Sequence, residues 1–287
     1  MSFWDIIWLY FIISSLQPLL QREWLSSSRR RTLALISRRR EVTVVTLIHR
    51  QETMSLLGFP VARYIDIDDA QSVLRAIRET PPGRGIEIIL HTPGGLVLAA
   101  SQIAQALADH DGPVTAVVPH YAMSGGTLIA LAADSIVLDR HCALGPVDPQ
   151  LGQYPAASLV EVSQLPGDHD DQTLILADVG RKALRQVDAI VTHLLSRHME
   201  PAPAHELARL LSSGVWTHDH PLMADDLVKL GLPVRVGVPE EERTLMDLYP
   251  QPRGREAAVE YAPWRRLPGL PARRNASSST PRRTTGN

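Results

Sequence analysis

Runs rich in Val, Ile and Leu alternate along this chain with stretches whose apolar residues recur every three or four positions. The runs predict buried strands, and the longer periodic stretches predict helices. The predicted strands are Val42–Ile48, Val61–Ile67, Ile86–Leu90, Val114–Val118 and Asp134–Leu138. The predicted helices are Ala70–Glu79 (capped by Asp68 and Asp69), Leu96–Leu107, Thr127–Ala133, Leu174–Met199, His205–Leu211 and Asp225–Leu230. Strands separated by helices indicate an α/β fold with a mostly parallel sheet and right-handed crossovers.

Other stretches lack this apolar period. Leu151–Asp171 contains several Gly, Pro and Asp residues and predicts a polar loop. Pro201 and Pro203 are expected to end the long helix before them. Residues 250–287 are rich in Arg, Pro, Ser and Thr, and we expect them to form a disordered basic tail.

The most apolar segment, Phe3–Leu20, lies at the N-terminus. Its length of roughly 18 residues is at the short end of what crosses a membrane. Two triple-arginine clusters follow, Arg29–Arg31 and Arg38–Arg40. By the positive-inside rule they predict that the chain after the apolar segment lies in the cytoplasm, and they are expected to bind anionic lipid headgroups. We therefore expect residues 1–24 to anchor the chain and residues 25–41 to form a basic juxtamembrane segment. A helix lying on the membrane or on a partner, with solvated arginines, is the alternative.

Composition excludes several classes of protein. The formal net charge of −2 argues against a dedicated nucleic-acid binder. A single cysteine, Cys142, excludes an internal disulfide framework, and no spacing of histidine and cysteine predicts a zinc site. The hydrophobic fraction of 44% is ordinary for a globular domain with a full core.

Two similar turns connect predicted strands to predicted helices. Residues 90–95 read Leu-His-Thr-Pro-Gly-Gly, and residues 121–127 read Tyr-Ala-Met-Ser-Gly-Gly-Thr. Paired glycines permit positive φ angles and turn backbone N–H groups into a concavity. Ser124 would then be a nucleophile beside an oxyanion-binding backbone formed by Gly95 or Gly94 together with Gly125. The alternative is a pair of ordinary strand-to-helix turns in which Ser124 only caps a helix.

A serine nucleophile needs a base, and three side chains are candidates for its support. His218 has a suitable near-neutral pKa, and Asp148 would orient that imidazole. Lys182, on the long helix, is an alternative base if burial lowers its pKa. Residue chemistry by itself leaves the choice open.

With these two turns, the sequence resembles the Clp-fold serine proteases. It is most similar to the membrane-associated serine dehydrogenase proteinase group, relatives of the Clp proteolytic subunit and the signal-peptide peptidases. The resemblance spans Val42–Pro239 and includes Leu144–Gln150 and Gly214–Asp219. It implies that residues 42–249 form a Clp/crotonase-like superhelix of ββα units. The Clp subunit has its histidine in the loop that here reads Leu144–Asp148, which contains none.

The serine dehydrogenase proteinase group uses Ser, Asp and His in that order along the chain. Carried over to this sequence, the order implies Ser124, Asp148 and His218, with Lys182 still the alternative base. The implied function is a membrane-associated serine endopeptidase without cofactor or metal. It would form an acyl-enzyme on polypeptide substrates, assemble as a homo-oligomer and keep its catalytic domain in the cytoplasm. A crotonase-like acyl-CoA enzyme and a catalytically silent membrane scaffold are the alternatives.

Overall fold

The computed structural model describes residues 3–49, 54–56, 59–61 and 64–249. In the N-terminal helix, only the backbone is described for most residues between 5 and 19. The predicted tail at 250–287 lies outside the described residues.

A parallel sheet forms the centre of the described chain, with its strands in the order β1-β4-β5-β7-β12. These strands are β1 (Thr43–Ile48), β4 (Ile86–His91), β5 (Val114–Val118), β7 (Ser135–Leu138) and β12 (Val234–Val236). Every residue of β4 is buried, which explains why its sequence is an apolar run rather than an alternation. The first four strands confirm the sequence prediction, whereas the short β12 was not predicted.

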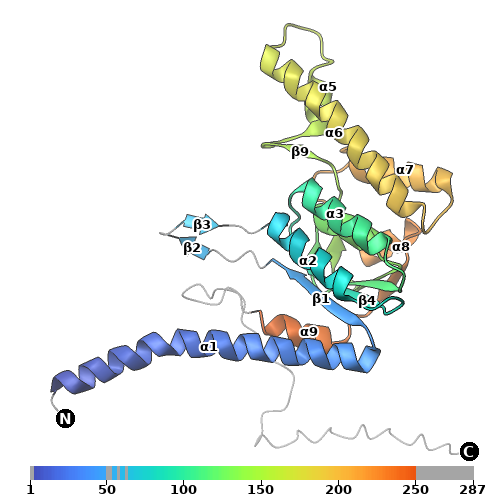
Figure 1. Ribbon diagram of the computed structural model, residues 1–287. Helices are drawn as coiled ribbons and strands as arrows, with labels where there is room; N and C mark the ends of the chain where they lie inside the picture. The colour runs from blue at the N-terminus through green and yellow to red at the C-terminus, as the bar shows by residue number, and fades with distance from the viewer. Residues whose placement is uncertain (1–2, 50–53, 57–58, 62–63, 250–287) are drawn as a thin grey trace, which may run out of the picture. The chain divides into compact units, whose positions relative to one another are not determined.

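Helices cover both faces of this sheet, as Figure 1 shows. Ile88 and Leu90 face the larger core beneath α2 (Ile67–Glu79) and α3 (Val97–Ala108). Ile89 faces the opposite core, beneath α1 (Phe3–Arg40) and α9 (Glu240–Asp247). Successive side chains of a strand point to opposite faces, so one strand serves both cores.

A second, small sheet consists of β6 (Tyr121–Ala122), β8 (Ala143–Leu144) and β11 (Leu222–Met223), in the order β11-β8-β6. Isolated bridges pair Ile65 with Gly95 and Thr92 with Ala122. The chain thus passes from a strand of the central sheet to a short strand of the small sheet and then to a helix, as in β5, β6 and α4 (Gly125–Leu131). This mixed α/β arrangement with a mostly parallel central sheet is consistent with a ClpP-like fold.

Several predicted elements were wrong. The strand expected at Val61–Ile67 is reduced in the described residues to the end of β3 (Phe59–Val61) and the bridge at Ile65. β3 pairs with β2 (Met54–Leu56) in a short hairpin. Ile67 already belongs to α2, because Asp66, rather than Asp68, caps that helix by accepting a hydrogen bond from the backbone N–H of Asp69.

The C-terminal half is more helical than expected. The predicted loop after Gln150 holds a hairpin of β9 (Gln150–Leu151) and β10 (Tyr154–Pro155), followed by α5 (Ala156–Val162). The long helix is α6 (Asp171–Leu195), and it ends before the prolines. Pro201 instead begins α7 (Pro201–Ser212). The first N–H groups of a helix have no acceptor within it, so a proline there costs no helical hydrogen bond. The short helix predicted next is confirmed as α8 (Ala224–Lys229).

The last turn of α1 is joined to α9 and the sheet by ion pairs. Arg40 contacts Glu87 of β4 at 2.6 Å and also pairs with Glu242, which is fully buried. Arg39 contacts Glu241 at 2.9 Å. Burial and the neighbouring Glu242 raise the pKa of Glu87 to about 7. Arg39 and Arg40 therefore bind protein carboxylates, a role that the sequence did not predict, while the Arg39 side chain remains 60% exposed.

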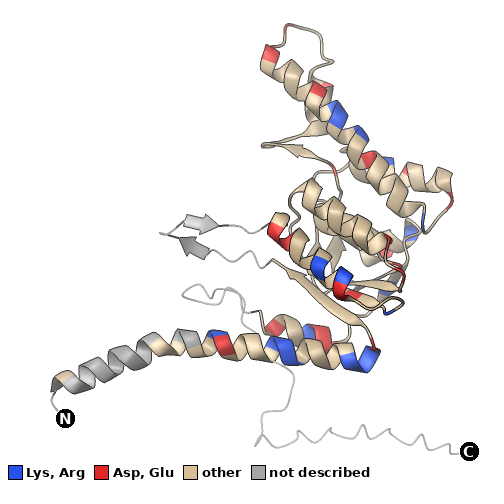
Figure 2. Ribbon diagram, in the orientation of Figure 1, with Lys and Arg blue, Asp and Glu red and all other residues tan. Residues whose placement is uncertain are grey.

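Nearer its N-terminus, α1 carries the other arginine cluster, visible as blue segments in Figure 2. Arg29 donates to the carbonyl of Leu248 at 2.9 Å, and its guanidinium lies 4.3 Å from the centre of the Tyr249 ring. The predicted membrane span is not supported, because no helix in the described part of the chain has the length and apolar character to cross a membrane.

Candidate active site

The small sheet brings three distant loops to one place. Its register aligns Ala122 of β6, Leu144 of β8 and Leu222 of β11. Ser124 follows β6 and Asp148 follows β8, which is parallel to it. His218 precedes β11, and since β11 is antiparallel to β8, this segment emerges at the same end of the sheet.

Ser124 occupies a strained turn between β6 and α4. Its φ of 50° and ψ of −115° lie in a region that residues with a side chain rarely adopt. Such strain costs on the order of 1–3 kcal/mol and persists only where the surrounding structure enforces it. Ser124 stands at the N-cap position of α4, but its side chain makes no capping hydrogen bond to the helix.

The two glycine turns are packed against each other. Gly94 has a φ of 110°, and a Cβ at this position would lie 2.7 Å from the Cβ of Ser124. A Cβ on Gly125 would lie 3.0 Å from that of Ala100 and 3.5 Å from the backbone nitrogen of Gly95. Only glycines allow the backbone of one turn to approach the serine of the other this closely.

The backbone amides of the two turns differ in whether they are already bonded. Gly94 donates its N–H to Thr92 Oγ1 at 3.1 Å. Among the described residues, no backbone or side-chain acceptor takes the N–H of Gly95 or of Gly125. These two amides are the pair that fits an oxyanion, whereas the N–H of Gly94 is used inside the turn.

His218 and Asp148 form a hydrogen-bonded pair across 70 residues of sequence, with 2.8 Å between Nδ1 and Oδ1. The other carboxylate oxygen of Asp148 accepts from Gln150 Nε2 at 2.6 Å, and Asp148 is only 2% exposed. The hydrogen bond to Asp148 raises the pKa of His218 above its ordinary value of 6.5, against the opposing effect of burial. Such a pair can hold an imidazole in one orientation and stabilise its charged form.

Further contacts connect the Asp148 loop with the Ser124 turn. Thr127 Oγ1 donates to the carbonyl of Ala122 at 2.8 Å and accepts the N–H of Gly145 at 3.0 Å. The end of the Met123 side chain packs against Gly145, with its methyl carbon 2.3 Å from where a Cβ would lie. Near His218, the rings of Trp216 and His220 stack with centres 5.4 Å apart.

Sequence reasoning did not assign roles to Gln150 and Thr127. Both lie within motifs that the resemblance had identified, since Gln150 ends the Leu144–Gln150 motif and Thr127 follows the Ser-Gly-Gly turn. The sequence motifs therefore pointed to both positions, but they did not indicate the hydrogen-bond partners of Gln150 and Thr127.

A sequence profile of the ClpP-like SDH-type serine proteinases matches residues 1–273. The chain belongs to this family. The family assignment confirms the resemblance seen in the two glycine turns and the two later motifs.

The chain is also similar to several other proteins. It is 49% identical to uncharacterized protein MJ0137 of Methanocaldococcus jannaschii, covering 90% of this chain and 91% of the relative. A second protein of that organism, MJ1495, is 46% identical, covering 92% and 89%. Membrane protein NfeD1b of Bacillus subtilis is 30% identical over 49% of this chain and 30% of its own length. Among solved structures, a point mutant of the 1510-N membrane-bound stomatin-specific protease shares 19% identity with a TM-score of 0.44, covering 71% of this chain and 82% of that one.

Lys182, the alternative base, lies on α6 and pairs with Asp178 one turn earlier. Its side chain is 58% exposed on the surface of the helix, so it is not the buried lysine that the alternative required. In the described part of the chain, no three His, Cys, Asp or Glu side chains are grouped so that they could hold a metal ion.

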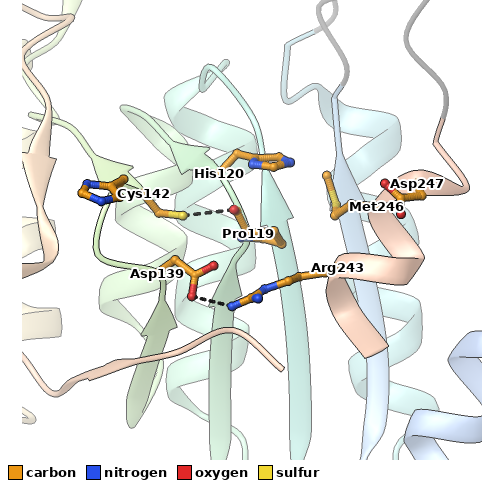
Figure 3. Close-up of a pocket in the computed structure, with 8 residues that line it drawn as sticks. Pro119, His120, Asp139, Cys142, Arg243, Met246 and Asp247 are labelled. Carbon is orange, nitrogen blue, oxygen red and sulfur yellow. Dashed lines mark hydrogen bonds and ion pairs between the residues drawn. The ribbon is translucent and has the colours of Figure 1, made fainter. Parts of the chain in front are cut away.

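A separate pocket of about 460 Å³ lies where β5 and β7 end, against α9, and contains none of the predicted site residues. Figure 3 shows Arg243 reaching from α9 to Asp139, with 3.0 Å between them. Cys142 donates its thiol to the carbonyl of Pro119 at 3.0 Å, and burial raises the pKa of this thiol. The cysteine is therefore a small buried residue rather than a reactive nucleophile.

Proposed function

We propose that this chain is a serine endopeptidase that cleaves polypeptides through an acyl-enzyme on Ser124. The observation that carries the proposal is the convergence at one end of the small sheet. There the strained Ser124 turn, the two glycine N–H groups without an acceptor and the His218–Asp148 pair come from four separate loops. Membership of a family of serine proteinases supports the same chemistry.

In the first half of the reaction, Asp148 accepts a hydrogen bond from Nδ1–H of His218, and the unprotonated Nε2 is the base. His218 takes the proton of Ser124 Oγ as this oxygen attacks the peptide carbonyl. The N–H groups of Gly95 and Gly125 stabilise the negative charge that develops on the carbonyl oxygen. His218 then gives the proton to the leaving amine, and the peptide bond breaks.

In the second half, water takes the place of the amine. His218 removes a proton from water, which attacks the acyl carbon, and the proton returns to Ser124 Oγ as the acid product leaves. Throughout, Asp148 fixes the imidazole, and Gln150 fixes Asp148 through its second oxygen. No other group is needed for atoms and charges to balance.

We also propose that the protein is attached to a membrane through the start of α1, with its catalytic domain in the cytoplasm, and that it is a homo-oligomer. The apolar sequence of Phe3–Leu20 supports attachment, and Leu20 and Trp24 are exposed along α1. Ile175 and Val179 expose apolar surface on α6, which supports contact with another copy. Membrane fractionation and sedimentation of detergent-solubilised protein test the two proposals, and a soluble monomer would contradict both.

An active-site-directed fluorophosphonate tests the catalytic proposal on the full-length protein in detergent. We expect covalent labelling at Ser124, identified by mass spectrometry, and release of peptides from casein. Ser124→Ala should abolish both, whereas the matched control Ser196→Ala, at the exposed end of α6, should retain them. Labelling that survives Ser124→Ala, or a wild-type protein that is neither labelled nor cleaves casein, would overturn the proposal. In the latter case, turnover of an acyl-CoA would identify a crotonase-like enzyme.

A further inference from the structure

A second histidine–carboxylate pair lies directly behind the turn that contains Gly94 and Gly95. His49, just after β1, places Nε2 3.0 Å from Asp69 Oδ2 and Nδ1 3.0 Å from Thr92 Oγ1. Thr92 in turn accepts the N–H of Gly94 at 3.1 Å. A continuous chain of hydrogen bonds therefore runs from a carboxylate in α2 to the backbone of the candidate oxyanion turn.

Hydroxyl, imidazole and carboxylate follow one another here as they do in a catalytic triad, but burial excludes attack on a substrate. Thr92 has no exposed surface, and His49 is only 5% exposed. A peptide carbonyl cannot reach the Thr92 hydroxyl without opening the core. This group of three residues can act only by fixing other parts of the protein.

Thr92 is where the two glycine turns are joined. Its backbone N–H donates to Tyr121 at 3.2 Å, and its carbonyl accepts from Met123, the residue before Ser124, at 2.9 Å. Its methyl group occupies the space that a Cβ on Gly126 would need, 2.5 Å away. A shift of the Thr92 side chain would therefore change the position of Gly94 relative to Ser124.

One assignment of donors and acceptors is consistent with every contact in this chain of hydrogen bonds. If Asp69 accepts the hydrogen bond from His49 Nε2–H and the imidazole carries only this proton, Nδ1 is left as an acceptor. The Thr92 hydroxyl then donates to Nδ1, and its lone pair receives the Gly94 N–H. Asp69 is itself held by the backbone N–H of Asp66, at 3.1 Å, in the capping box that begins α2.

We propose that His49, oriented by Asp69, is a positioning residue for catalysis, which fixes the Thr92 hydroxyl and through it the Gly94 amide. With the N–H of Gly94 bonded inside the turn, the next amide, that of Gly95, is left for the oxyanion. The inference rests on the proposed peptidase function, because it assigns a role in that reaction to residues that do not touch the substrate.

Matched substitutions at Thr92 test the role of the hydroxyl. Thr92→Val keeps the shape of the side chain and removes the hydroxyl, whereas Thr92→Ser keeps the hydroxyl. A misplaced or lost oxyanion donor costs on the order of 10²-fold in rate. We expect Thr92→Val to lower both kcat on casein-derived peptides and the rate of Ser124 labelling by fluorophosphonate by about 10- to 100-fold, with KM changed less than about threefold. Thr92→Ser should stay within about threefold of wild type in kcat, in KM and in the rate of Ser124 labelling.

His49→Gln tests the other end of the chain. We expect a loss similar to that of Thr92→Val, and the double variant should lose little more than either single variant, because the residues act through one hydrogen-bond chain. Hydrogen exchange at the Gly94 amide, followed in folded protein, should be faster in Thr92→Val and unchanged in Thr92→Ser. This measurement detects the altered turn independently of activity.

The outcomes distinguish this inference from the proposed function. If wild type and Thr92→Val label Ser124 at the same rate, the positioning role is wrong and the peptidase proposal stands. If Thr92→Val loses labelling only in proportion to its unfolded fraction, with Gly94 exchange unchanged in the folded protein, the residues serve stability alone and the inference fails. A wild-type protein that is not labelled at all overturns both.

Discussion

Two histidine–carboxylate pairs in this protein have nearly the same geometry and opposite exposure. The nitrogen–oxygen distance is 2.8 Å in His218–Asp148 and 3.0 Å in His49–Asp69. In the first pair, the histidine side chain is 33% exposed and the carboxylate 1%; in the second, the histidine is 6% exposed and the carboxylate 29%. An imidazole can exchange protons with a substrate only where the substrate reaches it, so exposure rather than the pair itself decides the role.

The difference follows from the elements that carry the histidines. His218 lies in a loop before a two-residue strand at the rim of the small sheet. His49 directly follows β1 of the central sheet, and its backbone N–H donates to the carbonyl of His91 while its ring contacts Asp69 of α2. The two roles that we propose for histidine, proton transfer at the rim and backbone positioning in the core, follow from these placements.

The largest expected effect separates the two histidines directly. His218→Ala and Ser124→Ala should each lower kcat by about 10⁴- to 10⁶-fold, and the double variant should lose little more, because base and nucleophile act as a unit. His49→Gln should lose no more than about 10²-fold. Peptide hydrolysis under single-turnover conditions measures all of these. A His218→Ala enzyme with near wild-type activity would remove His218 from the mechanism.

Removing one carboxylate at a time sharpens the contrast. Asp148→Asn should lower kcat by about 10²- to 10⁴-fold, less than loss of the base itself, since the imidazole remains but is misoriented. His218 must be neutral to accept a proton, so the rate of wild type should fall as pH decreases through a pKa above 6.5. Asp148 raises that pKa, and in Asp148→Asn this fall should therefore move to lower pH. Asp69→Asn is the control, and the rate of this variant should fall at the same pH as that of wild type. A shift of this pH in Asp69→Asn would contradict the separate roles of the two pairs.

A smaller effect is expected from the group that holds Asp148. Gln150→Leu leaves a buried carboxylate oxygen without its hydrogen bond, which should lower the free energy of unfolding by about 1–3 kcal/mol. Gln153→Leu, at an exposed position in the same hairpin, should change it by less than about 0.5 kcal/mol. Urea unfolding of the two variants measures the difference. Equal stabilities would show that Gln150 does not support the pair.

The smallest effect is expected at Lys182. Its ion pair with Asp178 is exposed, and such pairs contribute between 0 and about 1 kcal/mol. Lys182→Ala should therefore keep kcat within about twofold of wild type. A loss as severe as that of Ser124→Ala would move the base from His218 to Lys182 and leave Asp148 as a structural residue of its loop.

The sequence alone was sufficient wherever a local pattern reflects a local cause. Four strands of the central sheet were predicted because burial on both faces requires continuous apolar runs. Ser124 and its neighbouring glycines were identified because a strand-to-helix turn of this type has few possible residues. Asp148 and His218 were candidates by residue chemistry, and the resemblance put them ahead of Lys182; nothing in the residues between them showed that they would meet.

Only the tertiary structure decided which groups contact one another. Strands of two or three residues, such as β11 and β12, are too short to show a period, yet β11 sets where His218 lies. The arginines at the end of α1 have the same charge whether lipid or Glu242 faces them. His49 meets Thr92 across 43 residues, and the choice between the amides of Gly94 and Gly95 depends on that contact. Hydrogen bonds between distant residues depend on strand register and helix placement, which the pattern of a single segment does not contain.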